Sequence, residues 1–376
     1  MARKSNVAIA TTDNAQSKKF ALLQKVCSEI QSKFGKESVN FLGNNKVAPI
    51  PRVTSGSRVI DQIIGGGYPL GRIIEIFGPA SSGKTTVCYH AIAEFQKAFP
   101  DKWCGFVDSE YSYDPEYSAN VGVNVAELVV AQPDSGTDAF AMVQAMIENG
   151  ASLVVVDSVA AMVPREEVEE EDYGKSQIGV QARMMSKGLR KLTSVIGKYQ
   201  CVVIFTNQTR TKIGVLYGDP SVTAGGNSLQ YYASIRLKVT KTGVVEEGHG
   251  DDKEKTSITT RVEAVKNKTF PPFRRGEIQI VFGKGVDNEA GVLEEIISNG
   301  IIQKKGGWYA YEGTNVAQGL INLKIWISQH QDEYQNMKKK LEEITSSQVV
   351  EETPDENVEE TSSDEEMEST ETGEIE

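Results

Sequence analysis

The chain has 376 residues, of which 39% are hydrophobic, enough for one large α/β domain with smaller attachments. No apolar stretch approaches the roughly 20 residues that a membrane-spanning helix needs, so we expect no membrane partner and a cytoplasmic location. The net charge of −12 comes from residues 351–376, which hold thirteen acidic side chains and no Lys or Arg; the rest of the chain is nearly neutral.

The first predicted element is an amphipathic helix over residues 17–34, which Gly35 ends. Its apolar side chains recur at three- and four-residue steps and form one stripe: Phe20, Leu23, Cys27, Ile30 and Phe34. A proline- and glycine-rich stretch separates this helix from the next predicted strand. The stripe can therefore pack on the body of its own protomer or on another subunit, and the sequence leaves both open.

A glycine-rich loop follows the strand-like run at residues 72–77 and fits the pattern G-x-x-x-x-G-K-[ST]. Its members are Gly78, Pro79, Ala80, Ser81, Ser82, Gly83, Lys84 and Thr85. Backbone N–H groups of such a loop point inward, and the following helix presents its positive end, so the loop attracts phosphate. We expect ATP to bind here, with Lys84 on the β- and γ-phosphates, Thr85 ligating Mg²⁺ and Thr86 among the nucleotide contacts.

Strand-like apolar runs alternate with helical stretches along the middle of the chain. The runs cover residues 73–77, 105–108, 128–131, 153–157, 202–206 and 235–239. This alternation predicts an α/β fold with a largely parallel, twisted sheet covered by helices. The run at 153–157 lacks polar alternation, which is typical of a central strand buried on both faces. After residue 285 the pattern becomes short and mixed, which predicts a small α/β C-terminal domain.

Polar side chains follow three of these strands. Asp157 ends a buried strand and is positioned to hold the water shell of the Mg²⁺ that Thr85 binds. Glu110 lies just beyond the end of the neighbouring strand and is the candidate general base for a water molecule. Gln208 follows another strand and is a candidate γ-phosphate sensor. Together they predict a site for ATP hydrolysis.

The segment at residues 209–227 combines glycine hinges, the cations Arg210 and Lys212, and an apolar cluster that includes Ile213 and Tyr217. Cations can bind phosphates while apolar and aromatic side chains contact base faces, as a flexible single strand of nucleic acid requires. Loops of this length in a compact core are usually functional. The segment is therefore predicted to bind single-stranded nucleic acid.

With these elements in this order, the chain resembles the RecA recombinases of bacteria and phages over roughly residues 15–340. Besides the phosphate loop, stretches in the family's order lie at residues 54–57, 108–110, 114–117, 182–186, 225–227 and 265–268. The resemblance implies a RecA-like P-loop ATPase core and an ATP hydrolase stimulated by DNA. It also implies a homo-oligomeric helical filament on single-stranded DNA that exchanges strands with homologous double-stranded DNA in recombination and repair, with room for accessory loading or single-strand-binding proteins.

The resemblance also implies individual roles. Glu110 would activate water, Tyr117 would stack on adenine with Asp114 near its amino group, and Lys266 and Lys268 would reach phosphates bound by the neighbouring subunit. The N-terminal helix would dock on the next protomer, a heterologous contact that does not close into a ring. The implied DNA contacts are Arg183, Arg190, Arg210, Lys212, Ile213, Tyr217, Gly225, Gly226 and Asn227.

The expected organisation is an N-terminal polymerisation arm of helix and strand at residues 1–45, the ATPase core at 46–286, the small C-terminal domain at 287–342 and an acidic disordered tail at 343–376. The tail either serves solubility alone or competes with DNA for basic surface on the core, and the sequence leaves both open.

Three features depart from the bacterial pattern. Ala80 stands where that pattern usually has Glu, the first DNA loop within residues 165–178 is markedly acidic, and residues 238–255 form a longer, acidic stretch. The acidic loop should repel phosphate locally. Two other functions stay open at this point: a ring-forming motor of the helicase kind with the same core, and a scaffold whose assembly is switched by nucleotide.

Overall fold

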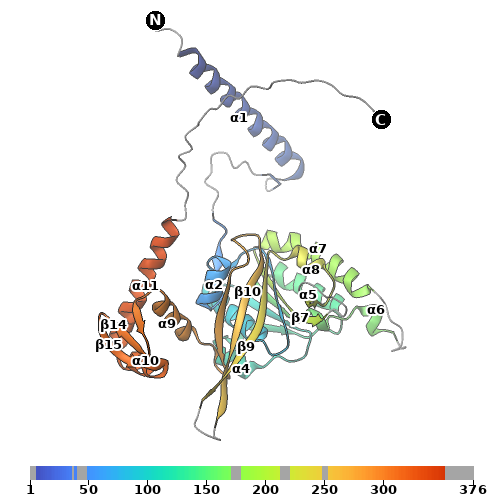
Figure 1. Cartoon of the computed structure of the whole chain (residues 1–376). Helices are drawn as coiled ribbons and strands as arrows, with labels where there is room; N and C mark the ends of the chain where they lie inside the picture. Colours follow the sequence, from blue (N-terminus) through green and yellow to red (C-terminus); the bar gives the residue numbers. More distant parts are fainter. Residues whose placement is uncertain are drawn as a thin grey trace, which may run out of the picture.

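The computed structural model describes residues 6–35, 38–39, 49–170, 179–211, 221–247 and 253–351. Figure 1 shows a sheet-and-helix core, a smaller C-terminal domain beside it and an N-terminal helix apart from both. Within the described ranges, no helix has the length and apolar character to cross a membrane.

The central sheet has a parallel half and an antiparallel half. The parallel strands are β3 (Ile73–Gly78), β4 (Trp103–Asp108), β5 (Leu128–Ala131), β6 (Ala151–Asp157), β7 (Val202–Thr211) and β9 (Ile235–Glu247). The antiparallel additions are β8 (Ser221–Thr223), β10 (Glu254–Asn267), β11 (Arg275–Val281) and β12 (Gly285–Val286). The strand order is β12-β11-β10-β9-β3-β7-β6-β4-β5, with β8 paired to β7 off this path.

The prediction of a largely parallel sheet is confirmed. Every residue of β3 and β6 is buried, as expected for apolar strands with helices on both faces. The antiparallel strands β10 and β11, which follow β9 in the sheet, extend it beyond the predicted runs. Burial alternates along most of β10, a pattern typical of a strand with only one covered face.

Helices cover both faces of the sheet (Figure 1). One face carries α2 (Arg58–Ile64), α3 (Lys84–Ala98) and α4 (Pro115–Val121), which share a core cluster with alternate residues of the strands. The other face carries α5 (Gly136–Glu148), α7 (Val180–Tyr199) and α8 (Ser228–Tyr232). Short elements complete the core: β1 (Arg52–Val53), β2 (Tyr68–Pro69), η1 (Val125–Glu127), η2 (Val159–Ala161) and α6 (Arg165–Val168).

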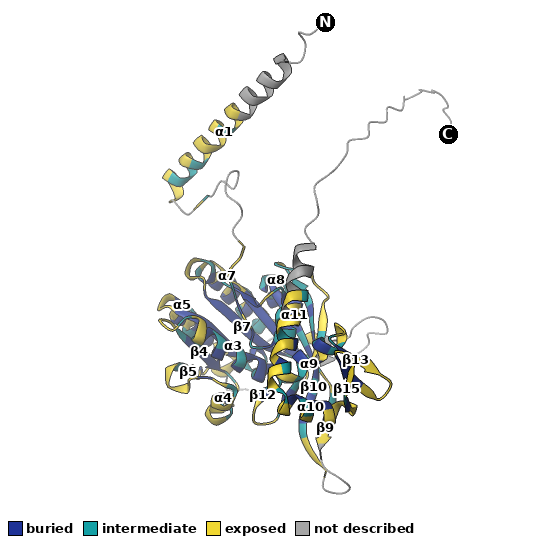
Figure 2. Ribbon diagram, turned by 90° about the vertical axis from the view of Figure 1, so that its left-hand side faces the viewer, coloured by how far each residue is buried: buried dark blue, intermediate teal, exposed yellow. Residues whose placement is uncertain are grey.

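The predicted N-terminal helix is present as α1 (Asn6–Phe34) and begins earlier than the apolar stripe indicated. Gly35, with a φ of 97°, ends it. In Figures 1 and 2 the helix stands away from the core. Two members of the apolar stripe, Leu23 and Phe34, are 37% and 75% exposed. Both packing alternatives for the apolar stripe therefore stay open.

The C-terminal domain has its own small core. It consists of α9 (Asn288–Ser298), β13 (Ile302–Lys305), β14 (Trp308–Tyr311), β15 (Thr314–Gln318), α10 (Gly319–Gln329) and α11 (Gln331–Glu351). Leu293, Ile296, Leu323 and Met337 are buried together in it. The α11 helix continues past residue 342, where the tail was expected to begin; the described part of the chain stops at Glu351.

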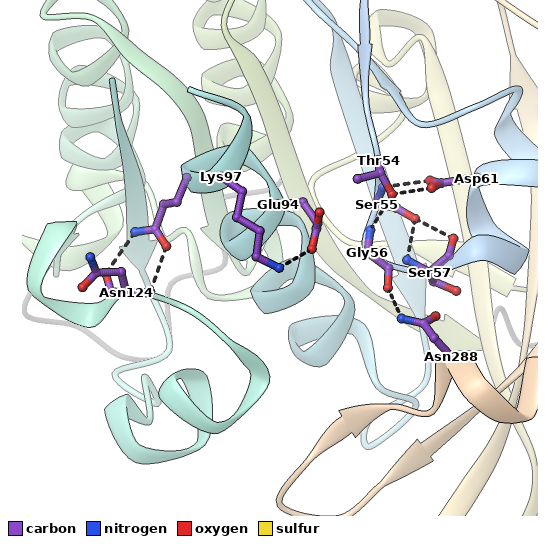
Figure 3. A network of polar contacts seen from close by, with 10 residues as sticks. Thr54, Ser55, Gly56, Ser57, Asp61, Glu94, Lys97, Asn124 and Asn288 are labelled. Carbon is purple, nitrogen blue, oxygen red and sulfur yellow. Dashed lines mark hydrogen bonds and ion pairs between the residues drawn. The ribbon is translucent and has the colours of Figure 1, made fainter. Parts of the chain in front are cut away.

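The turn before α2 ties this domain to the core (Figure 3). The Asp61 carboxylate accepts hydrogen bonds from the Ser55 N–H at 2.7 Å and from the Thr54 hydroxyl. The Asn288 amide then donates to the Gly56 carbonyl at 2.6 Å. The stretch at residues 54–57, one of those that support the resemblance, therefore connects the C-terminal domain to the core.

His90 on α3 connects that helix to the last strand of the sheet. Its Nε2 accepts a 2.8 Å hydrogen bond from the backbone N–H of Val286, which requires this nitrogen to be unprotonated. Burial lowers the pKa of His90 to about 4. The folded chain therefore resists a proton that the unfolded chain accepts near its ordinary pKa of about 6.5.

The free energy of unfolding is expected to fall as the pH drops from about 6.5 towards 4, because the neutral imidazole is favoured only in the folded state. His90→Gln keeps an acceptor for Val286 and removes the titration. Between pH 7 and pH 5, wild type should lose about 1 to 2 kcal/mol more stability than this variant. Urea titrations of both proteins at the two pH values measure the difference, and equal losses would contradict the assignment.

Candidate functional site

The phosphate loop joins β3 to α3, and two of its glycines are required by close packing. A Cβ on Gly78 would lie 1.9 Å from the backbone oxygen of Val239, and one on Gly83 would lie 2.2 Å from Cδ1 of Ile280. Gly83 also has a φ of 91°, which an L-residue rarely adopts. The loop therefore approaches its neighbours with bare backbone and leads into the N-terminus of α3, where N–H groups lack helical partners.

Lys84 folds back across this loop. Its ammonium donates to the Pro79 carbonyl at 2.7 Å and to the Gly78 carbonyl at 3.3 Å. Burial lowers the pKa of Lys84, while the carboxylates of Asp157 and Glu110 oppose that shift. The Lys84 ammonium thus lies inside the loop, where it is bound to two backbone carbonyls. The anionic oxygens of a phosphate can take the place of these carbonyls.

Thr85 and Asp157 meet at the carboxyl edge of the sheet. The Thr85 hydroxyl donates to Oδ2 of Asp157 at 2.6 Å, and the Thr206 hydroxyl donates to Oδ1. Burial raises the pKa of Asp157, and the two hydroxyl donors oppose the shift. Hydroxyl and carboxylate oxygens suit Mg²⁺, which takes few protein ligands and keeps several waters. The donor set fits the expected ion, and sequence reasoning missed Thr206.

Glu110 and Gln208 also lie together. Oε1 of Glu110 accepts a hydrogen bond from Gln208 Nε2 at 2.9 Å and another from the Ser158 hydroxyl. The strand before Gln208 was predicted to end at Thr206, which is wrong: β7 continues to Thr211 because it pairs with β8. Gln208 is therefore a strand residue whose side chain holds Glu110.

The loop that carries Glu110 is fixed by a residue that had not been assigned a role. Asp108 is fully buried, and its carboxylate accepts from the backbone N–H groups of Ser112 and Tyr113, both at 3.0 Å. Gln132 donates to the same carboxylate at 3.2 Å. The position of Asp108 at the end of a strand was a signal in the sequence, but its partners come from the following turn and from Gln132, the residue after β5.

The residues expected near the base of the nucleotide lie beside α3. The Tyr117 and Thr86 hydroxyls are 2.9 Å apart. Asp114 is exposed and caps α4, accepting a hydrogen bond from the Tyr117 N–H at 2.9 Å. The Asp114 carboxylate thus has a structural role as a helix cap and sets the position of Tyr117.

Lys266 and Lys268 lie towards the amino ends of the parallel strands, whereas the phosphate loop follows the carboxyl end of β3. Lys266 is level with Arg236, the second residue of β9, and Arg236 is level with Glu75 near the middle of β3. Lys268 lies further towards the amino end, where its N–H donates to the Ser234 carbonyl just before β9, whereas the phosphate loop begins at Gly78, the last residue of β3. Both ammonium groups donate to the Tyr231 carbonyl at the end of α8, at 3.1 Å and 3.3 Å. Burial and the charges of Lys268 and Arg236 lower the pKa of Lys266 to about 8.

The predicted DNA-binding residues fall into four groups, the last of which is Gly225 to Asn227. Arg183 and Arg190 are exposed on α7. Arg210 lies on β7 opposite Val222 of β8, so the long segment begins as a strand and includes a second strand before its end. Lys212, Ile213 and Tyr217 lie outside the described residues.

The segment returns through two glycines of positive φ. A Cβ on Gly225 would lie 2.8 Å from Cγ1 of Val159, and one on Gly226 would lie 2.9 Å from Cβ of Ala182, on α7. Asn227 is exposed at the start of α8. These two glycines let the returning backbone pack closely on η2 and α7, beside the exposed arginines.

A cavity of about 500 Å³ opens beside Arg183 between α5 and α7. Phe140 and Met184 line its apolar part, and Lys187 and Lys191 add charge on the same side of α7. Sequence reasoning missed these two lysines, although their four-residue spacing from Arg183 places them on one helix face.

Comparison with known proteins agrees with this architecture. The family model for the RecA N-terminal domain matches residues 21–287, and that for the RecA C-terminal domain matches residues 290–345. A protein named Protein RecA from Paracoccus denitrificans is 45% identical over 323 residues, covering 85% of this chain and 89% of the relative. One from Gloeobacter violaceus is 42% identical over 346 residues, covering 92% and 91%.

A third relative named Protein RecA, from Treponema denticola, is 44% identical over 339 residues, covering 89% of this chain and 80% of the relative. The chain therefore belongs to the RecA family, whose members are DNA-dependent ATPases that use ATP with Mg²⁺, form filaments on single- and double-stranded DNA and carry out strand exchange in recombination and repair.

Proposed function

We propose that the ATP site of this RecA protein is shared between neighbouring protomers of the filament. The phosphate loop, Glu110 and Gln208 act from one protomer, and Lys266 and Lys268 act from the next. The observation that supports this division is the position of the lysines: they lie towards the amino ends of the parallel strands, and their own phosphate loop lies at the carboxyl end of β3. Their ammonium groups bind the backbone carbonyl of Tyr231 and not the phosphate loop, so they are placed to act on the phosphates of a neighbouring protomer in the filament.

On the first protomer, the α3 N-terminus and Lys84 bind the phosphates, while Thr85 would ligate Mg²⁺ and Asp157 would hold its water shell. Bound Mg²⁺ would supply charge neutralisation at the phosphate oxygens. Glu110 takes a proton from the attacking water, and Ser158 and Gln208 orient its carboxylate through their hydrogen bonds. Water attack then transfers the γ-phosphoryl group to water and releases ADP and phosphate.

Gln208 is well positioned to report on the γ-phosphate. Its amide holds Glu110 at 2.9 Å, and a phosphate oxygen is a stronger, charged acceptor that competes for the same N–H group. Gln208 also belongs to the strand that leads into the predicted DNA segment. A change of partner at Gln208 would therefore move the backbone that precedes that segment.

The remaining assignments are proposals on the same basis. Tyr117 would stack on adenine with Asp114 beside it, and Thr86 would hold the Tyr117 hydroxyl. The DNA-binding surface would be formed by the residues that the resemblance implies: Arg183, Arg190, Arg210, Lys212, Ile213, Tyr217 and Gly225 to Asn227. We place the protein in the cytoplasm, with an arm at 1–45, a core at 46–286, a C-terminal domain at 287–342 and a tail from 343.

Steady-state ATP hydrolysis with and without single-stranded DNA tests the proposal. Turnover should rise when DNA is added, and filaments should be visible by electron microscopy under the same conditions. Closed hexameric rings in place of filaments would favour the ring-forming motor. Filaments with negligible hydrolysis would favour the nucleotide-switched scaffold.

A further inference from the structure

One charged side chain lies in the centre of the sheet and has no role in the site described above. Glu75, on β3, is fully buried between apolar neighbours, Ile74 and Ile76, in the same strand. Burying a carboxylate is costly unless it is paired and hydrogen-bonded. Glu75 meets this cost with partners on both adjacent strands, Asn207 on β7 and Arg236 on β9.

Asn207 connects Glu75 to the nucleotide sensor and to the DNA segment. Its amide donates to Oε1 of Glu75 at 3.1 Å and to the Ala224 carbonyl at 3.0 Å. Its side-chain oxygen accepts from the Gln208 N–H at 2.9 Å. One fully buried amide therefore fixes the Gln208 backbone and the returning end of the DNA segment at the same time.

Arg236 connects Glu75 to the lysine edge. Its Nε donates to the other carboxylate oxygen of Glu75, and the Arg236 side chain is only 14% exposed. The guanidinium also lies 4.4 Å from the ring centroid of Phe77, on the strand that enters the phosphate loop. Arg236 is level with Lys266 across β9 and β10, so its position affects the charge environment of that lysine.

We infer that Glu75 is a positioning residue that couples the DNA segment and Gln208 to the Arg236–Lys266 edge of the same protomer. The inference rests on the shared ATP site proposed above. The Glu75 carboxylate accepts a hydrogen bond from the Asn207 amide and at the same time neutralises the positive charge of Arg236. When DNA shifts the backbone at Ala224, Asn207 transmits the shift to Glu75, and Glu75 transmits it to the cation next to the lysines that face the neighbouring protomer.

Glu75→Gln tests this coupling in the full-length protein. The Gln side chain has the same shape as that of Glu75, but it is uncharged and can place its NH₂ donor against the Arg236 guanidinium, which is also a donor. We expect the ratio of turnover with single-stranded DNA to turnover without it to fall about tenfold, within the range of ordinary coupling energies. Binding of a fluorescent ATP analogue without DNA should stay within about twofold, because Glu75 does not touch the phosphate loop side chains.

Glu277→Gln is the matched control. Glu277 pairs with Arg261 at 3.1 Å across adjacent strands of the same sheet, but both side chains are nearly half exposed. The control should retain the wild-type ratio. If wild type itself shows no stimulation by DNA, the proposed function fails; if wild type is stimulated and Glu75→Gln matches it, the coupling inference alone is wrong.

A pH profile separates positioning from simple support of the fold. Glu75 opposes the lowering of the Lys266 pKa, while burial, Lys268 and Arg236 cause it. In Glu75→Gln the alkaline limb of kcat/KM should therefore move to lower pH, and in Glu277→Gln it should not. An unmoved limb in Glu75→Gln would contradict the link between this carboxylate and the lysine edge.

A double variant covers the case in which Glu75→Gln folds poorly. Glu75→Gln combined with Arg236→Met removes both charges, and replacing a buried ion pair in this way is often neutral for stability. We expect the double variant to fold and to remain poorly stimulated by DNA. A folded double variant with the wild-type stimulation ratio would show that the pair serves the fold alone.

Discussion

ATP hydrolysis is expected to disappear in Lys84→Ala and to slow by about 10²- to 10⁴-fold in Glu110→Gln, the range that a general base contributes. The two variants should differ in binding. Lys84 provides the cation inside the phosphate loop, so its loss weakens ATP binding itself. Glu110 lies outside the loop and is held by Gln208 and Ser158, so the cradle stays intact without its charge.

Binding of a fluorescent ATP analogue and single-turnover hydrolysis separate these effects. Glu116→Gln is the matched control, because Glu116 is an exposed carboxylate a few residues along the same segment. This control should bind and hydrolyse ATP like wild type. Equal loss of ATP binding in Lys84→Ala and Glu110→Gln would overturn the assignment of Glu110 as the base.

The parallel half of the fold could be predicted from sequence because its signals are local. The run at residues 153–157 is apolar without alternation, and the structure buries every one of these residues. The phosphate loop carries its own pattern, and parallel strands place their carboxyl ends at one edge. That rule is sufficient to expect Thr85 near Asp157. In the structure the Thr85 hydroxyl lies 2.6 Å from Oδ2 of Asp157.

The parts that sequence could not supply depend on contacts between distant segments. Thr206 donates to Asp157 because β6 and β7 are adjacent, and nothing in the neighbourhood of Thr206 in the sequence indicates this. The extension of β7 past Gln208 needs β8, which lies on the far side of the undescribed residues 212–220. In the sequence, Glu75 is a single charged residue within an apolar run. Its partners Arg236 and Asn207 lie on other strands, so only the structure shows why a carboxylate is placed there.

The shared site predicts that two inactive variants restore activity when mixed. Glu110→Gln has an intact lysine edge, and the double variant Lys266→Ala/Lys268→Ala has an intact phosphate loop. In filaments assembled at random from equal amounts, about a quarter of the interfaces join the two intact sides, since each head-to-tail contact uses different surfaces of its two protomers. DNA-stimulated turnover should therefore reach about a quarter of the wild-type value.

A mixture of Glu110→Gln with Lys84→Ala is the control for this experiment. Both substitutions lie on the phosphate-loop side of the interface, so no arrangement of neighbours brings two intact sides together. Fluorescently labelled subunits confirm that each pair enters the same filament. If the first mixture stays as inactive as the control despite co-assembly, each protomer hydrolyses ATP with its own residues alone, and Lys266 and Lys268 act elsewhere than on the neighbour's phosphates.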